Sequence, residues 1–414
     1  MSLTLADILA LPGLESMRLR AGQAMHNNPV RWPYVAENSS IAEWIMGGEL
    51  VFVTGINHPR DDEENLLLLV RQAQQRAAAG LVILTGPEYI KQIPQSVIDT
   101  AQQLGVPLIE QPYSLKMVVV TQAIGTALVQ AQMLGRSRQH LLEQLLEGDV
   151  QSLDSLLQRA HSLGLPLTTA RQVALLKLEG SERLIEAFGA DQAESILQGS
   201  RERLQRALQQ LLDTLGQALA PVCQGEHWIA LLPAVARNDQ QRNRQAMQEL
   251  IEALNPELAP LRLYLGLSTE GHGPARFAHA LHEARQALVA AQSFPERLGV
   301  CSFNELGAIE LLGAIRDRSV LDQFVNKVLG PIISDDNRHE PVLMPTLEAW
   351  FHESGNLALA AQRLGVHRNT MSYRTQRIET LTGSSFSNPH DRLNISIALL
   401  IWRLSSSRPA RSTA

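Results

Sequence analysis

The chain has 414 residues, too many for one ordinary hydrophobic core, and this length predicts about two to four domains. Hydrophobic residues make up 45% and aromatic residues 4% of the composition, which excludes a disordered chain and favours many helices. The formal net charge of −6 excludes a uniformly basic protein that coats nucleic acid, so any contact with DNA must come from a local basic patch.

Residues 1–112 alternate between extended and helical patterns. Strands are expected at Val30–Ala36, Leu50–Thr54, Leu81–Leu84 and Val106–Ile109, and helices at Ile41–Met46, from Asp61 to Gly80, and from Pro94 to Gly105. This alternation predicts a mostly parallel sheet covered by helices, which places ligands at the carboxyl ends of its strands. The candidate ligand-binding residues, which mix charged and aromatic side chains, are Arg31, Trp32, Tyr34, Glu37, Glu49 and Thr54. Trp32 and Tyr34 fit packing roles equally well.

Residues 113–170 are expected to form a helical linker. The pattern is helical from Ser114 to Glu147, and such a helix can serve as a dimerisation stalk or pack on its own domain; the sequence favours neither. The most apolar window, Met117–Leu134, is interrupted by threonine and glutamine, so we expect no membrane span.

Residues 171–300 have the pattern of a second unit, of α+β type. Strands are expected at Val173–Leu178, His227–Leu232 and Leu261–Ser268, and helices at Ser195–Leu219, Gln240–Leu254 and Ala275–Gln292. The last helix carries one apolar stripe, formed by Phe277, Leu281, Ala284, Leu288 and Ala291. Residues 301–341 are expected to be a linker, because Ser334–Pro341 (SDDNRHEP) has the composition of a solvated loop.

Residues 342–404 carry the start and stop signals of a group of short helices, and residues 405–414 are expected to be a flexible tail. Thr346 is the expected cap of the first helix and Asn356 the cap of the second. A turn at Gly365-Val366 precedes a third helix that begins at His367, and Asn388-Pro389 opens a fourth. Two helices around a turn that contains glycine, braced by flanking helices, form the all-α helix-turn-helix pattern.

The third of these helices is expected to present a polar face. At about 100° per residue, Met371, Ile378 and Leu381 cluster inward. The residues able to reach base edges in a major groove are Arg368, Asn369, Ser372, Tyr373 and Gln376. Arg374 and Arg377 fit phosphate contact or an internal brace better. The stretch from Arg363 to Arg377 holds four arginines and no acid, which is the local charge that DNA binding requires. An ordinary solvated helix on a bundle is the alternative.

The stretch LALAAQRLGVHRNTMSYRTQRIETLTG resembles the C-terminal helix-turn-helix of PucR-type (purine-catabolism-regulator-like) transcription factors. The matching core is His367, Arg368, Asn369, Thr370, Tyr373 and Arg374. The N-terminal stretches Asn28–Glu37, Gly47–Gly55 and Ile93–Pro112 resemble the sensory domain of the same family. The resemblance adds His367 and Thr370 to the residues expected at promoter or operator DNA. It implies a transcription regulator, often an activator of a catabolic operon, whose N-terminal domain senses a small metabolite such as a purine-pathway compound or an amino-acid derivative.

The middle segment resembles a degenerate GGDEF domain, the fold of enzymes that condense two GTP molecules. In QGEHWIALLP (Gln224–Pro233), Gln224 replaces a glycine and His227 replaces a glutamate. Lys177 and Glu179 stand near where a cyclase supplies a metal-binding aspartate, and a magnesium–triphosphate site needs oxygen ligands. We therefore expect a scaffold or dimerisation role, with no catalytic residue, no metal and no cofactor.

The remaining signals are weak. His279 and His282 share a helix face, but no third metal ligand accompanies them. Cys223 and Cys301 have neither disulfide nor zinc spacing, and no basic residue precedes the short apolar stretch at the N-terminus, so we expect a cytoplasmic protein.

Three functions follow from the sequence. The first is a DNA-binding regulator that forms a homodimer or a higher oligomer, because such modules normally act in symmetric pairs. The second is a nucleotide-cyclising enzyme, and the third is a metabolite-binding scaffold that never touches DNA.

Overall fold

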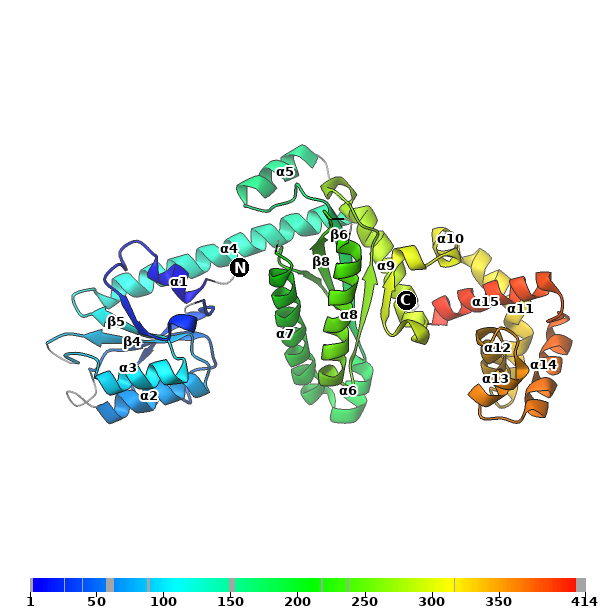
Figure 1. Cartoon of the computed structure of the whole chain (residues 1–414), viewed down its shortest axis with the longest axis horizontal. Helices are drawn as coiled ribbons and strands as arrows, with labels where there is room; N and C mark the ends of the chain where they lie inside the picture. Colours follow the sequence, from blue (N-terminus) through cyan, green and yellow to red (C-terminus); the bar gives the residue numbers. More distant parts are fainter. Residues whose placement is uncertain are drawn as a thin grey trace. The chain divides into compact units, whose positions relative to one another are not determined.

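The computed structural model divides the chain into two compact units, Met1–Leu141 and Leu142–Ala414. It describes residues 3–25, 27–38, 40–56, 63–87, 90–148, 153–216, 219–236, 238–315 and 317–406. Figure 1 shows both units, with labels on the helices and strands where there is room.

The first unit is built on a five-stranded sheet of order β1-β5-β4-β3-β2. Its strands are β1 (Arg18–Ala21), β2 (Trp32–Ala36), β3 (Glu49–Val53), β4 (Gly80–Thr85) and β5 (Leu108–Pro112). Strands β2 to β5 pair in parallel, and β1 runs antiparallel to β5. The prediction of a mostly parallel sheet is therefore confirmed, and the antiparallel edge strand is an addition to it.

Helices cover both faces of this sheet (Figure 1). On one face, α2 (Glu63–Gln75) and α3 (Gln95–Leu104) pack over a cluster that includes Val51 and Ile83. On the other face, α1 (Leu5–Leu9) and the start of α4 (Met117–Glu147) pack over a cluster that includes Phe52 and Val82. Because both faces are buried, the central strands are continuous apolar runs with no polar alternation. A short 3-10 helix, η1 (Gln23–Met25), follows β1.

Two expected features of this unit are wrong. Ile41–Met46 forms turns instead of a helix. The side chains of Ile41 and Ile45 are buried in the domain core and fix this loop to it. The helix expected to end at Gly80 ends at Gln75, and Gly80 opens β4. A side chain at Gly80 would sit about as close to Leu50 and Ile109 as packed atoms can approach, so the glycine belongs to the sheet core.

Helix α4 is continuous through Gly135 and is long and apolar enough to cross a membrane by length and composition. Only 17% of its most apolar window is buried. Its first turns nevertheless place Val120 and Ile124 in the core of the first unit, with no exposed surface. Those contacts make the start of α4 part of the core of the first unit.

The second unit begins with the last residues of α4 and continues with α5 (Leu153–Ser162). It contains a five-stranded sheet of order β10-β9-β6-β8-β7. Its strands are β6 (Arg171–Glu179), β7 (Val222–Gln224), β8 (His227–Pro233), β9 (Arg262–Leu267) and β10 (Val300–Ser302). The helices of this region are α6 (Ser181–Phe188), α7 (Ala190–Thr214), α8 (Asp239–Leu258) and α9 (Phe277–Ser293), with short 3-10 turns η2 (Pro274–Arg276), η3 (Pro295–Arg297) and η4 (Phe303–Glu305).

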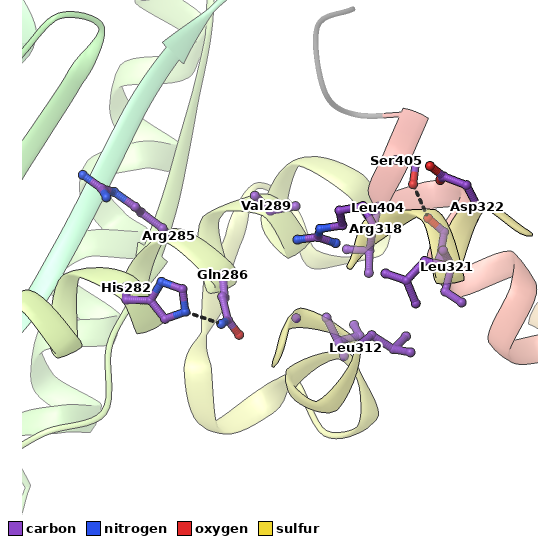
Figure 2. Close-up of a pocket in the computed structure, with 13 residues that line it drawn as sticks. His282, Arg285, Gln286, Val289, Leu312, Arg318, Leu321, Asp322, Leu404 and Ser405 are labelled. Atoms are coloured by element: carbon purple, nitrogen blue, oxygen red, sulfur yellow. Dashed lines mark hydrogen bonds between the residues drawn. The ribbon is translucent and has the colours of Figure 1, made fainter. Parts of the chain in front are cut away.

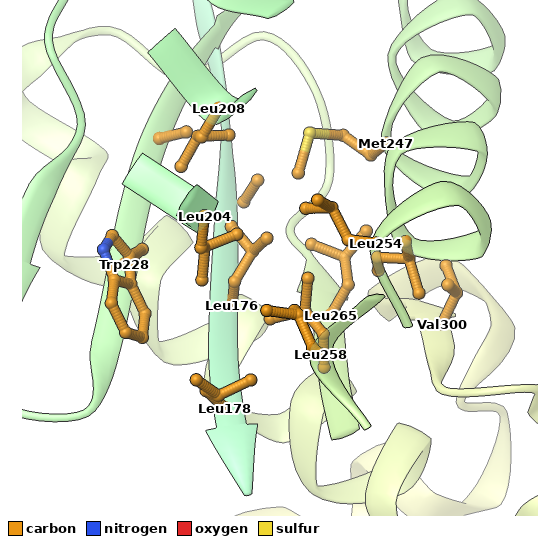
Figure 3. Close-up of a cluster of buried hydrophobic side chains, with 14 of the residues drawn as sticks. Leu176, Leu178, Leu204, Leu208, Trp228, Met247, Leu254, Leu258, Leu265 and Val300 are labelled. Carbon is orange, nitrogen blue, oxygen red and sulfur yellow. The ribbon is translucent and has the colours of Figure 1, made fainter. Parts of the chain in front are cut away.

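Helices α7 and α8 bury the main core of this sheet, in which Trp228, Leu204 and Leu265 meet (Figure 3). Helix α9 packs on the sheet at Gly266, where an added Cβ would lie 2.1 Å from the carbonyl oxygen of Ala284. Only a glycine permits so close an approach of helix to strand. The apolar stripe predicted for α9 is confirmed, because all five of its residues are buried: Phe277, Leu281, Ala284, Leu288 and Ala291.

The segment 301–341, expected to be a linker, is structured. It contains the end of β10, α10 (Ala308–Ala314) and the long helix α11 (Arg318–Arg338). Of the polar residues that suggested a loop, Ser334–Arg338 form the end of α11 and the rest follow it. They are polar because two of them, Asp335 and Asp336, bind groups of the helices that follow.

Candidate nucleic-acid interface

Four helices follow α11 and form a small bundle with it: α12 (Leu343–His352), α13 (Leu357–Arg363), α14 (Arg368–Thr382) and α15 (Pro389–Ser406). Helices α13 and α14 meet through Ala360, Ala361 and Met371, all buried. Trp350 of α12 stacks on Phe386 with ring centroids 4.4 Å apart, which covers the end of this cluster. The buried face of α14 thereby packs against α12 and α13.

The turn between α13 and α14 has the geometry that the sequence indicated. Asn356 caps α13, and its side-chain oxygen accepts hydrogen bonds from the backbone N–H of Ala358 and Leu359 at 3.0 and 3.2 Å. Gly365 adopts a left-handed φ of 64°, and the N–H of Val366 donates to the carbonyl of Ala361 at 3.0 Å. A residue with a Cβ is strained at such a φ, so the glycine is what permits this tight turn.

The start of α12 differs from the prediction. Thr346 does not cap this helix; it lies inside α12, fully buried, and its hydroxyl donates to the carbonyl of Val342. Asp336 of α11 supplies the acceptor instead. Its carboxylate accepts from the backbone N–H of Leu343 at 2.9 Å and of Met344 at 2.8 Å. A carboxylate at a helix N-terminus both satisfies free N–H groups and complements the helix dipole, so α11 fixes α12.

Helix α14 has one buried and one exposed face. Met371, Thr375 and Ile378 are buried. The exposed residues include every candidate for base contact, and Tyr373 exposes 63% of its surface: His367, Arg368, Asn369, Thr370, Ser372, Tyr373 and Gln376. They lie together on the first three turns of one helix, the part that enters a major groove in helix-turn-helix proteins. Arg374 is half-buried beside them.

The four arginines of this stretch divide into two pairs. Arg363 is bound to Glu353 at 3.1 Å, and one nitrogen of Arg377 donates to both carboxylate oxygens of Asp335 at 2.8 and 2.9 Å. Asp335 also raises the pKa of the Arg377 guanidinium by hydrogen bond and charge. Arg368 and Arg374 make no ion pair within the described part of the chain. Of the four arginines, only Arg368 and Arg374 are therefore available to pair with DNA phosphates without first leaving an ion pair of the described chain.

Sequence reasoning missed Asp335. It lies 42 residues before Arg377, in a stretch that resembled a loop, so only the fold brings the two together. The contact favours the brace over phosphate contact for Arg377, the two roles that the sequence left open.

A pair of substitutions separates those roles. If Arg377 is a brace, Arg377→Ala and Asp335→Ala will lower DNA affinity by the same factor, and the double variant will lose no more than either one, because each removes the same contact. If Arg377 contacts phosphate, Asp335→Ala will instead raise the affinity by freeing a cation. Fluorescence anisotropy with labelled DNA at several salt concentrations distinguishes the two results.

Around the expected metal position of the GGDEF-like region, the described residues do not have the arrangement of a magnesium site. Lys177 lies opposite His227 on neighbouring strands, and the Lys177 ammonium binds Glu179 at 2.7 Å. Burial, helped by the charges of Lys177 and Arg285, lowers the pKa of His227. Two of the groups near the expected metal position thus carry nitrogen where a cyclase presents oxygen ligands. His279 instead contacts Glu283 at 3.1 Å, and His282 contacts Gln286 at 2.8 Å. No group of three or more potential metal ligands occurs among the residues that the structure describes.

The six candidate ligand residues of the first unit do not form one site. Trp32 and Glu49 pair at the amino-terminal ends of β2 and β3, with Arg31 just before them. Glu37 and Thr54 follow the carboxyl ends of the same two strands. The Glu49 carboxylate is occupied locally by the N–H groups of Met46 and Gly47. Tyr34 is half-buried and packs against the core, whereas Trp32 is 58% exposed.

Three family models match the chain in order along its length. The purine catabolism regulatory protein-like family matches residues 7–128, a GGDEF-like domain matches residues 147–290, and the PucR C-terminal helix-turn-helix domain matches residues 343–401. The chain belongs to the PucR-type regulators. The exposed face of α14 and the GGDEF-like sheet therefore lie in domains that this family combines.

Individual relatives agree with this membership. The carbohydrate diacid regulator of Escherichia coli is 26% identical over 326 residues, which cover 77% of this chain and 75% of that protein. The purine catabolism regulatory protein of Bacillus subtilis is 30% identical over 115 residues, 28% of this chain and 21% of that protein. A solved structure, a regulator of polyketide synthase expression from Bifidobacterium adolescentis, matches 65% of this chain and 98% of its own length at 20% identity, with a TM-score of 0.24.

Proposed function

We propose that this PucR-type regulator binds promoter DNA in a sequence-specific way and activates a catabolic operon in response to a small metabolite. The observation that carries the proposal is the exposed polar face of α14, which starts with Arg368 and is held from behind by a packed helical bundle. Arg368, Asn369 and Gln376 are side chains that form paired hydrogen bonds with guanine or adenine edges in the major groove. Tyr373 projects from the same face.

The activating role rests on the relatives. Among them are a proline-responsive transcriptional activator of Bacillus subtilis, 23% identical over 145 residues that make up 35% of each protein, and the two regulators described above. Their names associate these relatives with purine catabolism, carbohydrate diacids and proline. For this chain we infer a small polar catabolite of comparable size.

Gel-shift measurements on the promoter beside the gene test the proposal directly. The full chain should retard that fragment at a concentration at least about a thousandfold below the one needed for unrelated DNA of the same length. A protein that consumed GTP would favour the cyclase, one that retarded neither fragment would favour the scaffold, and one that retarded both fragments alike would contradict sequence-specific binding. We expect no turnover of GTP, because Lys177 and His227 stand where oxygen ligands are needed.

The sensing site is proposed at the carboxyl ends of β2 and β3, beside Glu37 and Thr54. Ligands of parallel sheets bind at this end of the strands, which is the argument for placing the site here. The site that we infer therefore uses only part of the set that the sequence suggested.

This assignment predicts a difference between two glutamates of the same sheet. Glu37→Gln, at the carboxyl end, should abolish the shift in melting temperature that the effector causes, because a bound ligand stabilises the fold by RT ln(1 + [L]/Kd), about 2.7 kcal/mol at a hundredfold excess over Kd. Glu49→Gln, at the opposite end, is the matched control and should keep the shift. Scanning calorimetry of the full chain with intermediates of the neighbouring pathway gives the answer. Loss of the shift in Glu49→Gln alone would move the site to the other end.

A further inference from the structure

A cavity of about 420 Å³ lies in the second unit, between the GGDEF-like sheet region and the DNA-binding bundle (Figure 2). Four helices form its walls: α9, α10, α11 and α15. Its volume falls in the range of small-molecule sites, about 300–1,000 Å³. Its apolar wall is formed by Val289, Ile309, Leu312, Leu321, Ile401 and Leu404.

Arg318, the first residue of α11, supplies positive charge to this cavity. Figure 2 shows its side chain extending from α11 toward Gln286 and Val289, whereas the side chain of Arg285 points away from the middle of the cavity. Asp322, one turn further along α11, lies on the side of Ser405. Arg318 makes no ion pair within the part of the chain that the structure describes. An anion in the cavity could therefore pair with this guanidinium without first breaking another ion pair.

Gln286 gives a second, independent sign of a ligand. Its amide nitrogen lies 2.8 Å from the imidazole Nε2 of His282, while its amide oxygen is buried and has no hydrogen-bond partner. Buried polar atoms without a partner are rare in folded proteins and call for an explanation. The oxygen faces Gly313 of α10, where an added Cβ would lie only 2.8 Å from it. Gly313 thus lets the Gln286 oxygen pack closely against α10, and a ligand donor reaches this oxygen when the Gln286 side chain rotates toward the cavity.

We propose that this cavity binds a small monocarboxylate with an apolar body, aromatic or medium-chain aliphatic, that carries a hydrogen-bond donor. The carboxylate pairs with Arg318, the apolar body lies on the leucine, isoleucine and valine wall, and a hydroxyl or amino group donates to the Gln286 oxygen. Such a site is separate from the sensing site proposed in the first unit, and neither depends on the other.

The position of the cavity gives the ligand a route to the DNA-binding bundle. Helix α15 is attached to the end of α9 by Arg403, which lies 5.6 Å from the ring of Phe294 and binds Glu296 of η3 at 3.4 Å. The same side chain binds Glu348 of α12 at 2.8 Å. A ligand between α9, α11 and α15 contacts both sides of this attachment. Because linkage between two sites is reciprocal, a compound that binds here more tightly in the DNA-bound protein will also strengthen DNA binding.

Isothermal titration of the full chain with three compounds tests the proposal: para-hydroxyphenylacetate, phenylacetate, and the uncharged para-hydroxyphenylethanol. The hydroxyl acid should bind with a Kd below about 1 mM, and each of the other two should bind about tenfold more weakly, a difference of about 1.4 kcal/mol. No binding by the hydroxyl acid, or equal binding of acid and alcohol, overturns the proposal.

Variants then locate the site. Arg318→Gln should weaken the hydroxyl acid about tenfold, and Gly313→Ala should weaken it by crowding Gln286. Arg338→Gln, an exposed arginine at the other end of α11, is the matched control and should change nothing. Circular dichroism verifies that each variant is folded. Equal affinity of wild type and Arg318→Gln would contradict the assignment. So would a compound that binds only to a chain ended at Ser406, because residues 407–414 would then be the occupant.

Discussion

Arg368→Ala and Tyr373→Ala should each remove the preference for the operator while leaving the fold intact. Both side chains are exposed on α14 and make no contribution to its buried face, so the melting temperature should stay within about one degree of wild type. Loss of one good base contact costs about 1–3 kcal/mol, or about five- to a hundredfold in operator affinity. Binding to unrelated DNA should change far less.

Anisotropy titrations with operator and scrambled DNA measure both effects. Arg183→Ala, an exposed arginine on α6 in the GGDEF-like region, is the matched control and should bind both DNAs as wild type does. If Arg368→Ala and Tyr373→Ala left the operator and scrambled affinities unchanged, α14 would not be the helix that enters the groove.

The second large effect is expected on α4. Val118, Val129 and Met133 are 65%, 43% and 64% exposed, and at about 100° per residue they fall within one narrow stripe. Val120 and Ile124, which pack in the domain core, lie on the opposite side of the helix. An apolar stripe that its own domain leaves open fits a second copy of the same helix. We therefore expect a dimer. Of the two roles that the sequence left open for α4, we expect the dimerisation stalk and not a helix that packs only on its own domain.

Val129→Glu combined with Met133→Glu should dissociate that dimer, because charges within an apolar helix pair are not compensated. Light scattering should show a mass near 45.6 kDa in place of twice this value. Affinity for an operator with two half-sites should fall about a hundredfold or more, because the second half-site no longer benefits from linkage.

Leu134→Glu, an exposed position on another side of α4, is the control and should stay dimeric. A wild-type chain that scatters as a monomer at micromolar concentration, with and without DNA, would refute the role of the stripe.

The elements that the sequence predicted well have strong periodicity or a backbone signal. The α9 stripe recurs over four turns, and Gly105, Gly365 and Gly383 each end or join helices in the left-handed conformation that favours glycine. The expected exposed face of α14 follows from the same periodicity, because Met371 and Ile378 lie seven residues apart on the buried side.

Features that depend on distant contacts were not predictable. Asp336 caps α12 from the preceding helix, so the capping role given to Thr346 on local grounds was wrong. The pairing of Asp335 with Arg377 depends equally on the packing of α11 beside α14. In the first unit, the candidate ligand residues were close in sequence, but a strand of five residues separates Trp32 and Glu37 to opposite ends of the sheet.

Selection of genomic DNA fragments by the purified full chain tests the central claim most directly. Fragments bound at physiological salt, released and sequenced should share one motif made of two related half-sites, with centres about 10 base pairs or a multiple of this apart, as two α14 helices of a dimer require. The Arg368→Ala variant should recover no shared motif. Recovery of fragments in proportion to their abundance by the wild-type chain, with no motif enriched, would contradict the account.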